Sequence, residues 1–130
     1  MMKDKGLIIN DKKPRDIRER SFTFAIRVLK MGKALSKNSI NNILINQVVR
    51  SATSVGANIE EAQGAYTKSD FTHCMNIAKK EARETFYWLK LIKEMNPTIA
   101  KRLSLLLVEN EEIIKILTTI VKKSNPRSFN

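Results

Sequence analysis

Four stretches of this chain carry apolar residues at helical spacing, and this repetition constrains the fold more than any other feature. The residues recur at steps of three, four or seven, which places each set on one side of an α-helix. The four stripes are Ile17, Phe24, Val28, Met31 and Leu35; Leu44, Val48, Ala52, Val55, Ile59, Ala62 and Tyr66; Phe71, Met75, Ala78, Ala82, Thr85, Leu89 and Ile92; and Leu103, Leu106, Leu107, Ile113, Ile114, Leu117 and Val121. Because each stripe must be buried against another, the sequence predicts an all-α fold, an antiparallel up-down four-helix bundle.

Polar residues and one proline mark where these helices begin and end. Asp16 and Glu19 have the spacing of a capping box, which predicts that the first helix begins there. The segment SKNSINN interrupts the pattern before the second helix, and Ser69 is the predicted N-cap of the third. Asn96 followed by Pro97 ends the third helix and begins the fourth, because proline suits a first helical turn.

The length and composition fit one helical domain. A chain of 130 residues has room for a single core, and four Gly and three Pro argue against a β-rich fold. We predict a bundle at 15–123, between a mobile basic tail at 1–14 and a mobile tail at 124–130. With one Cys, and no stretch apolar enough for an export signal or a membrane span, the expected location is the cytoplasm, without membrane contact.

The charge of the chain favours a polyanionic partner. The sequence has 24 Lys and Arg against 13 Asp and Glu, a formal net charge of +11. Such a field attracts RNA or DNA in preference to a membrane, because no basic stretch is also a free-standing amphipathic anchor. The alternative is a basic protein whose charge only maintains solubility.

Two cationic patches are the candidate nucleic-acid contacts. On the predicted outer face of the third helix, cations lie beside an aromatic ring, so the cations would follow a phosphate backbone while the ring stacks on an unpaired base. A comparable cationic patch lies on the first helix. The residues of the two patches are Lys80, Arg83, Tyr87 and Lys90, and Arg20, Arg27 and Lys30. The alternative interpretation of both is a solvated charged face.

The helices carry more apolar surface than one bundle can bury. Outside the core stripes, the wheel of the first helix shows Phe22, Ile26 and Leu29, and that of the fourth shows Leu105 and Ile116. Surplus apolar surface of this kind usually marks a contact with another subunit, so we predict a homo-oligomer.

One polar series lies well away from the core stripe of the second helix. It contains Arg50, and small residues around it, Gly56 among them, would let another helix approach closely. Arg50 requires a carboxylate if it is partly buried, and the third helix and Glu61 offer three. The predicted contact residues, within one subunit or between two, are Arg50, Ser54, Asn58, Glu61, Glu81, Glu84 and Trp88.

Catalytic and metal-binding signatures are missing from the sequence. It contains no Gly-rich phosphate loop, no nucleophile elbow and no Glu-x-x-His pair, and one His and one Cys argue against a zinc site. We therefore predict that the protein is not an enzyme and has no cofactor and no metal site. Two alternatives stay open: a protein-interaction adaptor with no direct nucleic-acid role, and a metal- or ligand-dependent enzyme.

Two long motifs resemble a known family. RSATSVGANIEEAQGAYTKSDF at 50–71 and IAKKEARETFYWLKLI at 77–92 are similar to the bacterial four-helix-bundle proteins that include the 23S rRNA intervening-sequence proteins. The resemblance implies an antiparallel bundle that assembles into a ring-like homopentamer, with no established enzymatic activity. A distant relative is the nucleic-acid-binding accessory protein of diversity-generating retroelements, which also implies a reverse transcriptase as a partner protein.

The family motif falls on residues that the helical wheel already singles out. Its Arg, Ser, Asn and Glu in the second helix match Arg50, Ser54, Asn58 and Glu61, and its third-helix Glu matches Glu84. One departure is residue 60, which is Glu here, whereas the family more often has a small residue. The resemblance therefore predicts a non-enzymatic oligomeric scaffold that binds RNA.

Overall fold

Four helices make up nearly all of residues 16–125, the part of the chain that the computed structural model describes. They are α1 (Ile17–Ala34), α2 (Ser39–Gln63), α3 (Lys68–Met95) and α4 (Ala100–Ser124), and the 3-10 turn η2 (Pro97–Ile99) precedes α4. The predicted all-α class is confirmed, and residues 16–125 contain no strand.

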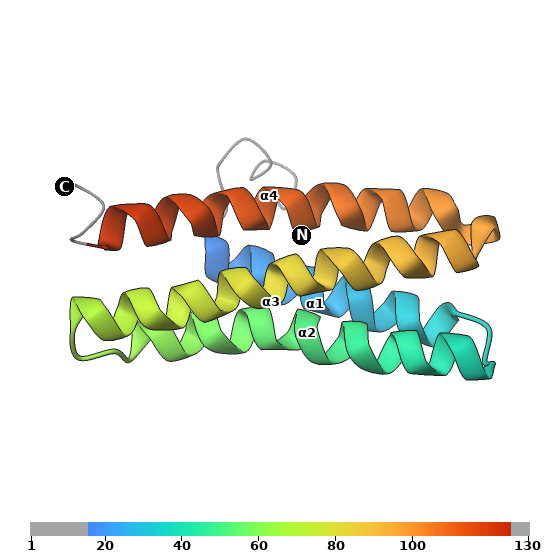
Figure 1. The fold of residues 1–130 in the computed structure, drawn as a ribbon, viewed down its shortest axis with the longest axis horizontal. Helices are drawn as coiled ribbons and strands as arrows, with labels where there is room; N and C mark the ends of the chain where they lie inside the picture. Colours follow the sequence, from blue (N-terminus) through green and yellow to red (C-terminus); the bar gives the residue numbers. More distant parts are fainter. Residues whose placement is uncertain (1–15, 126–130) are drawn as a thin grey trace, which may run out of the picture.

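The helices surround one core. In Figure 1 each helix turns back along the one before it, so that successive helices run in opposite directions. Both α1 and α3 pack against α2 and α4, which gives the order α1, α2, α3, α4 around the bundle. Two loops, between α1 and α2 and between α3 and α4, therefore lie at the same end of the molecule.

Side-chain caps decide where three of the helices begin. Asp16 caps α1 by accepting a hydrogen bond from the Arg18 N–H at 2.6 Å. Asn38 caps α2, so the second half of SKNSINN, from Ser39, already belongs to this helix instead of interrupting the pattern before it. The prediction of Ser69 as a cap is wrong: the Thr67 hydroxyl accepts from the Asp70 N–H at 3.0 Å, and α3 begins two residues earlier.

The other predicted boundaries need small changes. The helix α1 ends at Ala34, and α4 includes Ser124. The predicted tails at 1–14 and 124–130 lie outside the described residues, apart from positions 124 and 125.

The predicted stripes form the core. Most of their side chains are fully buried, including Val28, Val48, Leu89 and Leu117. Tyr66 is a wrong prediction because its side chain is 98% exposed: α2 ends at Gln63, before the stripe reaches it.

Buried polar residues link α3 to its neighbours; the predicted stripes included Thr85 but neither Asn110 nor Ser51. Asn110 is fully buried at a stripe position of α4, and its Nδ2 donates to the carbonyl of Ala82 at 3.0 Å. The buried Thr85 hydroxyl lies 2.8 Å from the Ser51 hydroxyl, which joins α3 to α2. These directional bonds fix the alignment of helices that apolar contacts alone would hold loosely.

A pair of amides ties the two loops at one end of the bundle. Asn41 and Asn96 each donate to the other's side-chain oxygen, at 3.1 and 2.9 Å. The Asn41 amide also donates to the carbonyl of Ser36, and that of Asn96 to Ile92. Since Asn41 is buried, this arrangement holds the α1–α2 loop against the start of η2.

Gly56 provides a test of how tightly α1 packs on α2. A Cβ at this position would lie 3.5 Å from the Ser21 hydroxyl oxygen, an ordinary contact distance, so close packing does not require glycine. We expect Gly56→Ala to raise the free energy of unfolding by about 0.5–1 kcal/mol, because alanine has the higher helix propensity. Urea unfolding followed by circular dichroism measures the change. A loss of stability would show that α1 approaches α2 more closely than this.

Candidate nucleic-acid interface

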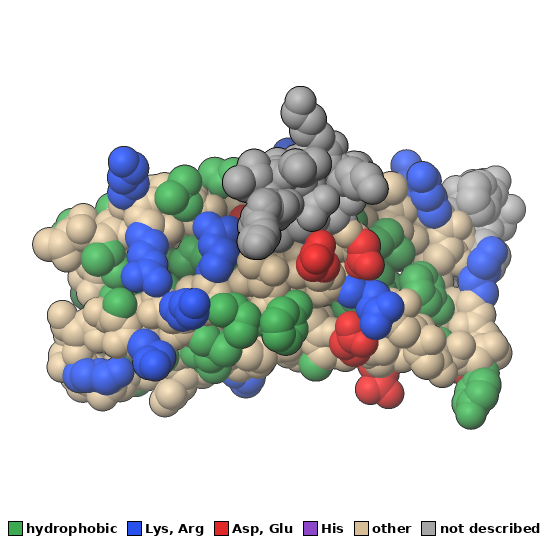
Figure 2. Space-filling model, turned by 180° about the vertical axis from the view of Figure 1, so that it is seen from behind, with side chains coloured by type: hydrophobic (Ala, Val, Ile, Leu, Met, Phe, Trp, Pro, Cys, Tyr) green, Lys and Arg blue, Asp and Glu red, His purple; other side chains and the backbone are tan. Residues whose placement is uncertain are grey.

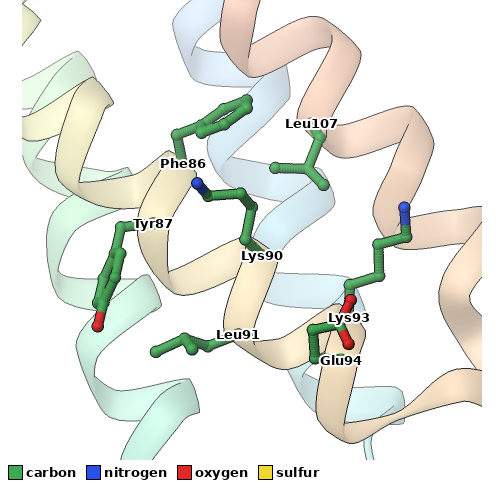
Figure 3. A pocket seen from close by; sticks show the side chains of 7 residues that line it. All are labelled: Phe86, Tyr87, Lys90, Leu91, Lys93, Glu94 and Leu107. Carbon is green, nitrogen blue, oxygen red and sulfur yellow. The ribbon is translucent and has the colours of Figure 1, made fainter.

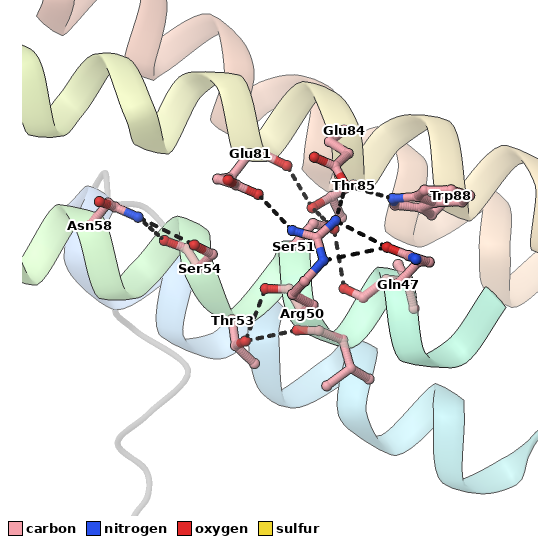
Figure 4. Close-up of polar contacts among 12 residues, drawn as sticks. Gln47, Arg50, Ser51, Thr53, Ser54, Asn58, Glu81, Glu84, Thr85 and Trp88 are labelled. Carbon is pink, nitrogen blue, oxygen red and sulfur yellow. Dashed lines mark hydrogen bonds and ion pairs between the residues drawn. The ribbon is translucent and has the colours of Figure 1, made fainter. Parts of the chain in front are cut away.

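A polar cluster joins α2 to α3 on the outside of the bundle (Figure 4). The Arg50 guanidinium reaches both carboxylates of α3 that the wheel predicted, at 3.5 Å from Glu81 and in hydrogen-bond contact with Glu84. It also donates to Gln47 at 3.1 and 3.3 Å. The predicted pairing of Arg50 is therefore confirmed, within one chain.

The same cluster extends to two aromatic rings. The Trp88 indole N–H donates to the Glu84 carboxylate at 3.0 Å, and the Tyr87 ring meets Trp88 edge-on, with 5.2 Å between centroids. The hydrogen bond from Trp88 lowers the pKa of Glu84 below its ordinary 4.5; burial opposes the change, and Arg50 adds to it. Arg50 and Glu84 thus fix Trp88, and Trp88 supports one side of Tyr87.

The other predicted contact residues of α2 are not part of this cluster. The Asn58 amide donates to the Ser54 carbonyl at 2.8 Å and to its hydroxyl at 3.3 Å, so these two residues bond along their own helix. Glu61 is exposed and, within residues 16–125, forms no ion pair.

The predicted cationic face of α3 lies on the molecular surface. Lys80, Arg83 and Lys90 are exposed, and the Tyr87 side chain is 52% exposed. None of these three cations is in an ion pair with another described residue. We call Lys80, Arg83, Tyr87 and Lys90 the α3 basic face.

A hollow of about 400 Å³ opens beside the α3 basic face (Figure 3). The Lys90 ammonium lies 5.3 Å from the centroid of the Phe86 ring, which leaves Tyr87 as the free aromatic surface. Lys93 and Leu107 also line the hollow. Sequence reasoning did not assign these two residues to the site. Leu107 was predicted as part of a core stripe, and it reaches the hollow only because α4 packs on α3.

The predicted patch on α1 is divided by the structure. Arg20 makes two hydrogen bonds to the Glu109 carboxylate, at 2.7 and 3.0 Å, and its side chain is 21% exposed. Arg20 is thus engaged in joining α1 to α4, and its guanidinium is already bound to a carboxylate. Lys30 is exposed and Arg27 is half-buried.

Sequence and structural comparisons agree on the family. Residues 13–119 match the family described as 23S rRNA-intervening sequence protein. The chain belongs to this family. A crystal structure of a protein of unknown function from the S23 ribosomal protein family of Bacteroides thetaiotaomicron is 36% identical in sequence and superposes with a TM-score of 0.76. The match covers 82% of this chain and 99% of that one. No curated protein matches the chain significantly.

Among residues 16–125, no group of three or more His, Cys, Asp and Glu is arranged to hold a metal ion. In the same range, no helix is both long and apolar enough to cross a membrane.

The position of Glu84 predicts how stability depends on pH. A carboxyl whose pKa is lowered on folding stabilises the protein above its unfolded pKa, and this contribution is lost as the pH falls through the folded pKa. We expect Glu84→Gln to cost roughly 1 kcal/mol at pH 7, because the side chain is one-third exposed, and progressively less below pH 4.5. Urea unfolding at several pH values measures both.

Glu111→Gln is the matched control, since Glu111 is exposed and has no ion pair within the described residues. An equal cost of Glu84→Gln at pH 7 and at pH 3 would contradict the assignment of the lowered pKa to this carboxyl.

Proposed function

We propose that this protein is a non-enzymatic, oligomeric scaffold that binds RNA through the α3 basic face. The observation that carries the proposal is a contrast among the arginines and lysines. Arg18, Arg20 and Arg50 each hold a carboxylate of another helix. The cations of the α3 basic face hold none within residues 16–125, and they flank an exposed aromatic ring. Cations without an internal carboxylate partner are available to phosphates.

The spacing of the side chains along the α3 basic face suits a single strand of RNA. Arg83 and Lys90 lie seven residues apart, about 10 Å along the helix, on either side of Tyr87. Phosphates bound by these two cations would leave the intervening base free to stack on the Tyr87 ring. The edge-on contact with Trp88 restrains this ring, which favours a stacking surface that is already ordered before RNA binds.

Two further considerations support the class of function. The family description names 23S rRNA, which favours RNA over DNA as the polyanion. The described residues offer no constellation of metal ligands, and no sequence motif for nucleophilic catalysis is present, which supports a binding role. The cytoplasmic location expected from the sequence is consistent with RNA as the ligand and with a binding role.

Exposed apolar residues on two sides of the bundle support self-association. On the α2–α3 side, Ile43 is 57% and Met95 56% exposed. Phe22 on the outer face of α1 is 68% exposed, and Leu105 on α4 is 57% exposed. Two different apolar faces on one subunit favour head-to-tail contacts, which generate a ring when the rotation between subunits closes. This arrangement is compatible with the homopentamer that the family resemblance implies.

RNA binding can be tested on the α3 basic face directly. We expect Arg83→Gln combined with Lys90→Gln to reduce the slope of log K against log salt for single-stranded RNA by about 1.4, since each lost phosphate contact contributes about 0.7. Tyr87→Ala should weaken binding by about 1–3 kcal/mol, with Tyr87→Phe as the control that keeps an aromatic ring. Filter binding at several salt concentrations measures these changes. The adaptor alternative predicts that no RNA binds even at low salt.

Self-association can be tested separately. We expect the wild-type chain to elute with a mass several times 14.9 kDa, five times for a pentamer, in size-exclusion chromatography with light scattering. Ile43→Glu should reduce the mass, because it buries an unpaired charge in the interface. Asn46→Glu, on an exposed polar position of the same helix, is the control. A monomeric wild type at tens of micromolar would refute the oligomer.

A further inference from the structure

The net charge of the described chain is concentrated at one end of the bundle. Residues 27–47 and 88–105 form this end, where the α1–α2 loop and the α3–α4 turn meet. They contain eight Lys or Arg and one Glu, a net charge of +7, while the other described residues contain ten cations and ten anions. We call the eight cations the basic end: Arg27, Lys30, Lys33, Lys37, Lys90, Lys93, Lys101 and Arg102.

Helix packing brings these cations together from distant parts of the sequence. Arg20 of α1 bonds Glu109 of α4, and the two helices run in opposite directions. Seven residues onward in α1 is Arg27, and seven residues back in α4 is Arg102, so these two lie at the same level of the bundle. Figure 2 shows Lys and Arg side chains gathered over this half, while acidic and basic side chains mix in the other half.

The platform under the basic end is rigid. The reciprocal amide bonds between Asn41 and Asn96 hold together the two connections between the helices from which most of the cations project. Within residues 16–125, no cation of the basic end is in an ion pair. Eight like charges on a fixed surface repel one another, and a bound polyanion relieves that repulsion.

We propose that the basic end is a second binding surface for the RNA strand that the α3 basic face contacts. This inference rests on the proposed function. Lys90 belongs to both surfaces and Lys93 lies one turn further along α3, so the cations form a continuous track. From Lys80 to Lys93 the track rises about 20 Å along α3, and it then spreads over the end of the bundle. A strand long enough to leave α3 gains additional phosphate contacts there.

The shape of this track favours a polynucleotide over an anionic membrane. A flat membrane would touch only the end of the bundle, whereas a flexible strand follows cations both along α3 and around the end. Exposed amides on the first turns of α2 add hydrogen-bond donors for phosphate and ribose oxygens. They belong to Asn38, Asn42 and Asn46.

A length series tests the inference with the full chain. An unstructured 8-nucleotide RNA, about 27 Å long at 3.4 Å per nucleotide, covers the α3 basic face and little more, while a 24-nucleotide RNA reaches both surfaces. The test variant is Lys101→Gln with Arg102→Gln. The matched control is Lys68→Gln with Lys123→Gln, which removes two exposed charges at the opposite end. Circular dichroism checks that both variants fold.

We expect the test variant to lower the slope of log K against log salt for the 24-nucleotide RNA by about 1.4. With the wild-type and variant lines meeting at 1 M salt, this change makes the affinity about 25-fold weaker at 0.1 M salt. Binding of the 8-nucleotide RNA should not change, and the control should match wild type with both RNAs. Equal losses in test and control variants would overturn the inference, because the charge would then act only as a global field.

Other outcomes separate this inference from the proposed function. If Arg83→Gln with Lys90→Gln weakens both RNAs while the basic-end variant weakens neither, the proposed function stands and the inference falls. If wild type binds neither RNA, both fall. Binding of phosphatidylserine vesicles but no RNA, abolished by the basic-end variant, would overturn the inference and assign the surface to a membrane.

Discussion

The contact between α2 and α3 is the interaction on which the rest of the molecule depends. Its interior is apolar and contains the bond between Ser51 and Thr85, and its outer edge is the cluster of Arg50 with Glu81 and Glu84. Arg50 is half-exposed, so its ion pairs contribute little to stability compared with the buried stripes. These ion pairs matter because they are directional. Apolar stripes can slide along each other, whereas a guanidinium that contacts two carboxylates holds α2 and α3 in one alignment.

The cations of this protein have two roles: some join helices through ion pairs, and others lie on the surface where a ligand can bind them. Arginines placed opposite a carboxylate of another helix, such as Arg20 and Arg50, hold the bundle together. Most of the other cations of the described residues lie on α3 or at one end of the bundle. The cluster around Arg50 links the two roles, since it fixes Trp88 and through it Tyr87.

Much of the fold and part of the site follow from local pattern. Helical periodicity identified the core stripes, and the predicted partners of Arg50 were Glu81, Glu84 and Glu61, of which the first two contact it. The helical pattern gave wrong predictions where the burial of a residue depended on the end of its helix or on a partner in another helix. Tyr66 continues the stripe of α2 in the sequence, but the helix ends before it. Asn110 is polar and was not predicted in the core, yet it is buried there because the Ala82 carbonyl accepts its hydrogen bond.

The sequence by itself determined four amphipathic helices, their core faces, the family and the excess of positive charge, because all of these depend on residue identity and on spacing within one helix. Only the tertiary structure decided where the charge lies. Segments 27–47 and 88–105 are far apart in the chain, and local spacing does not reveal that they share one end. Packing of α1 on α4 and the amide pair between the loops bring their eight cations together.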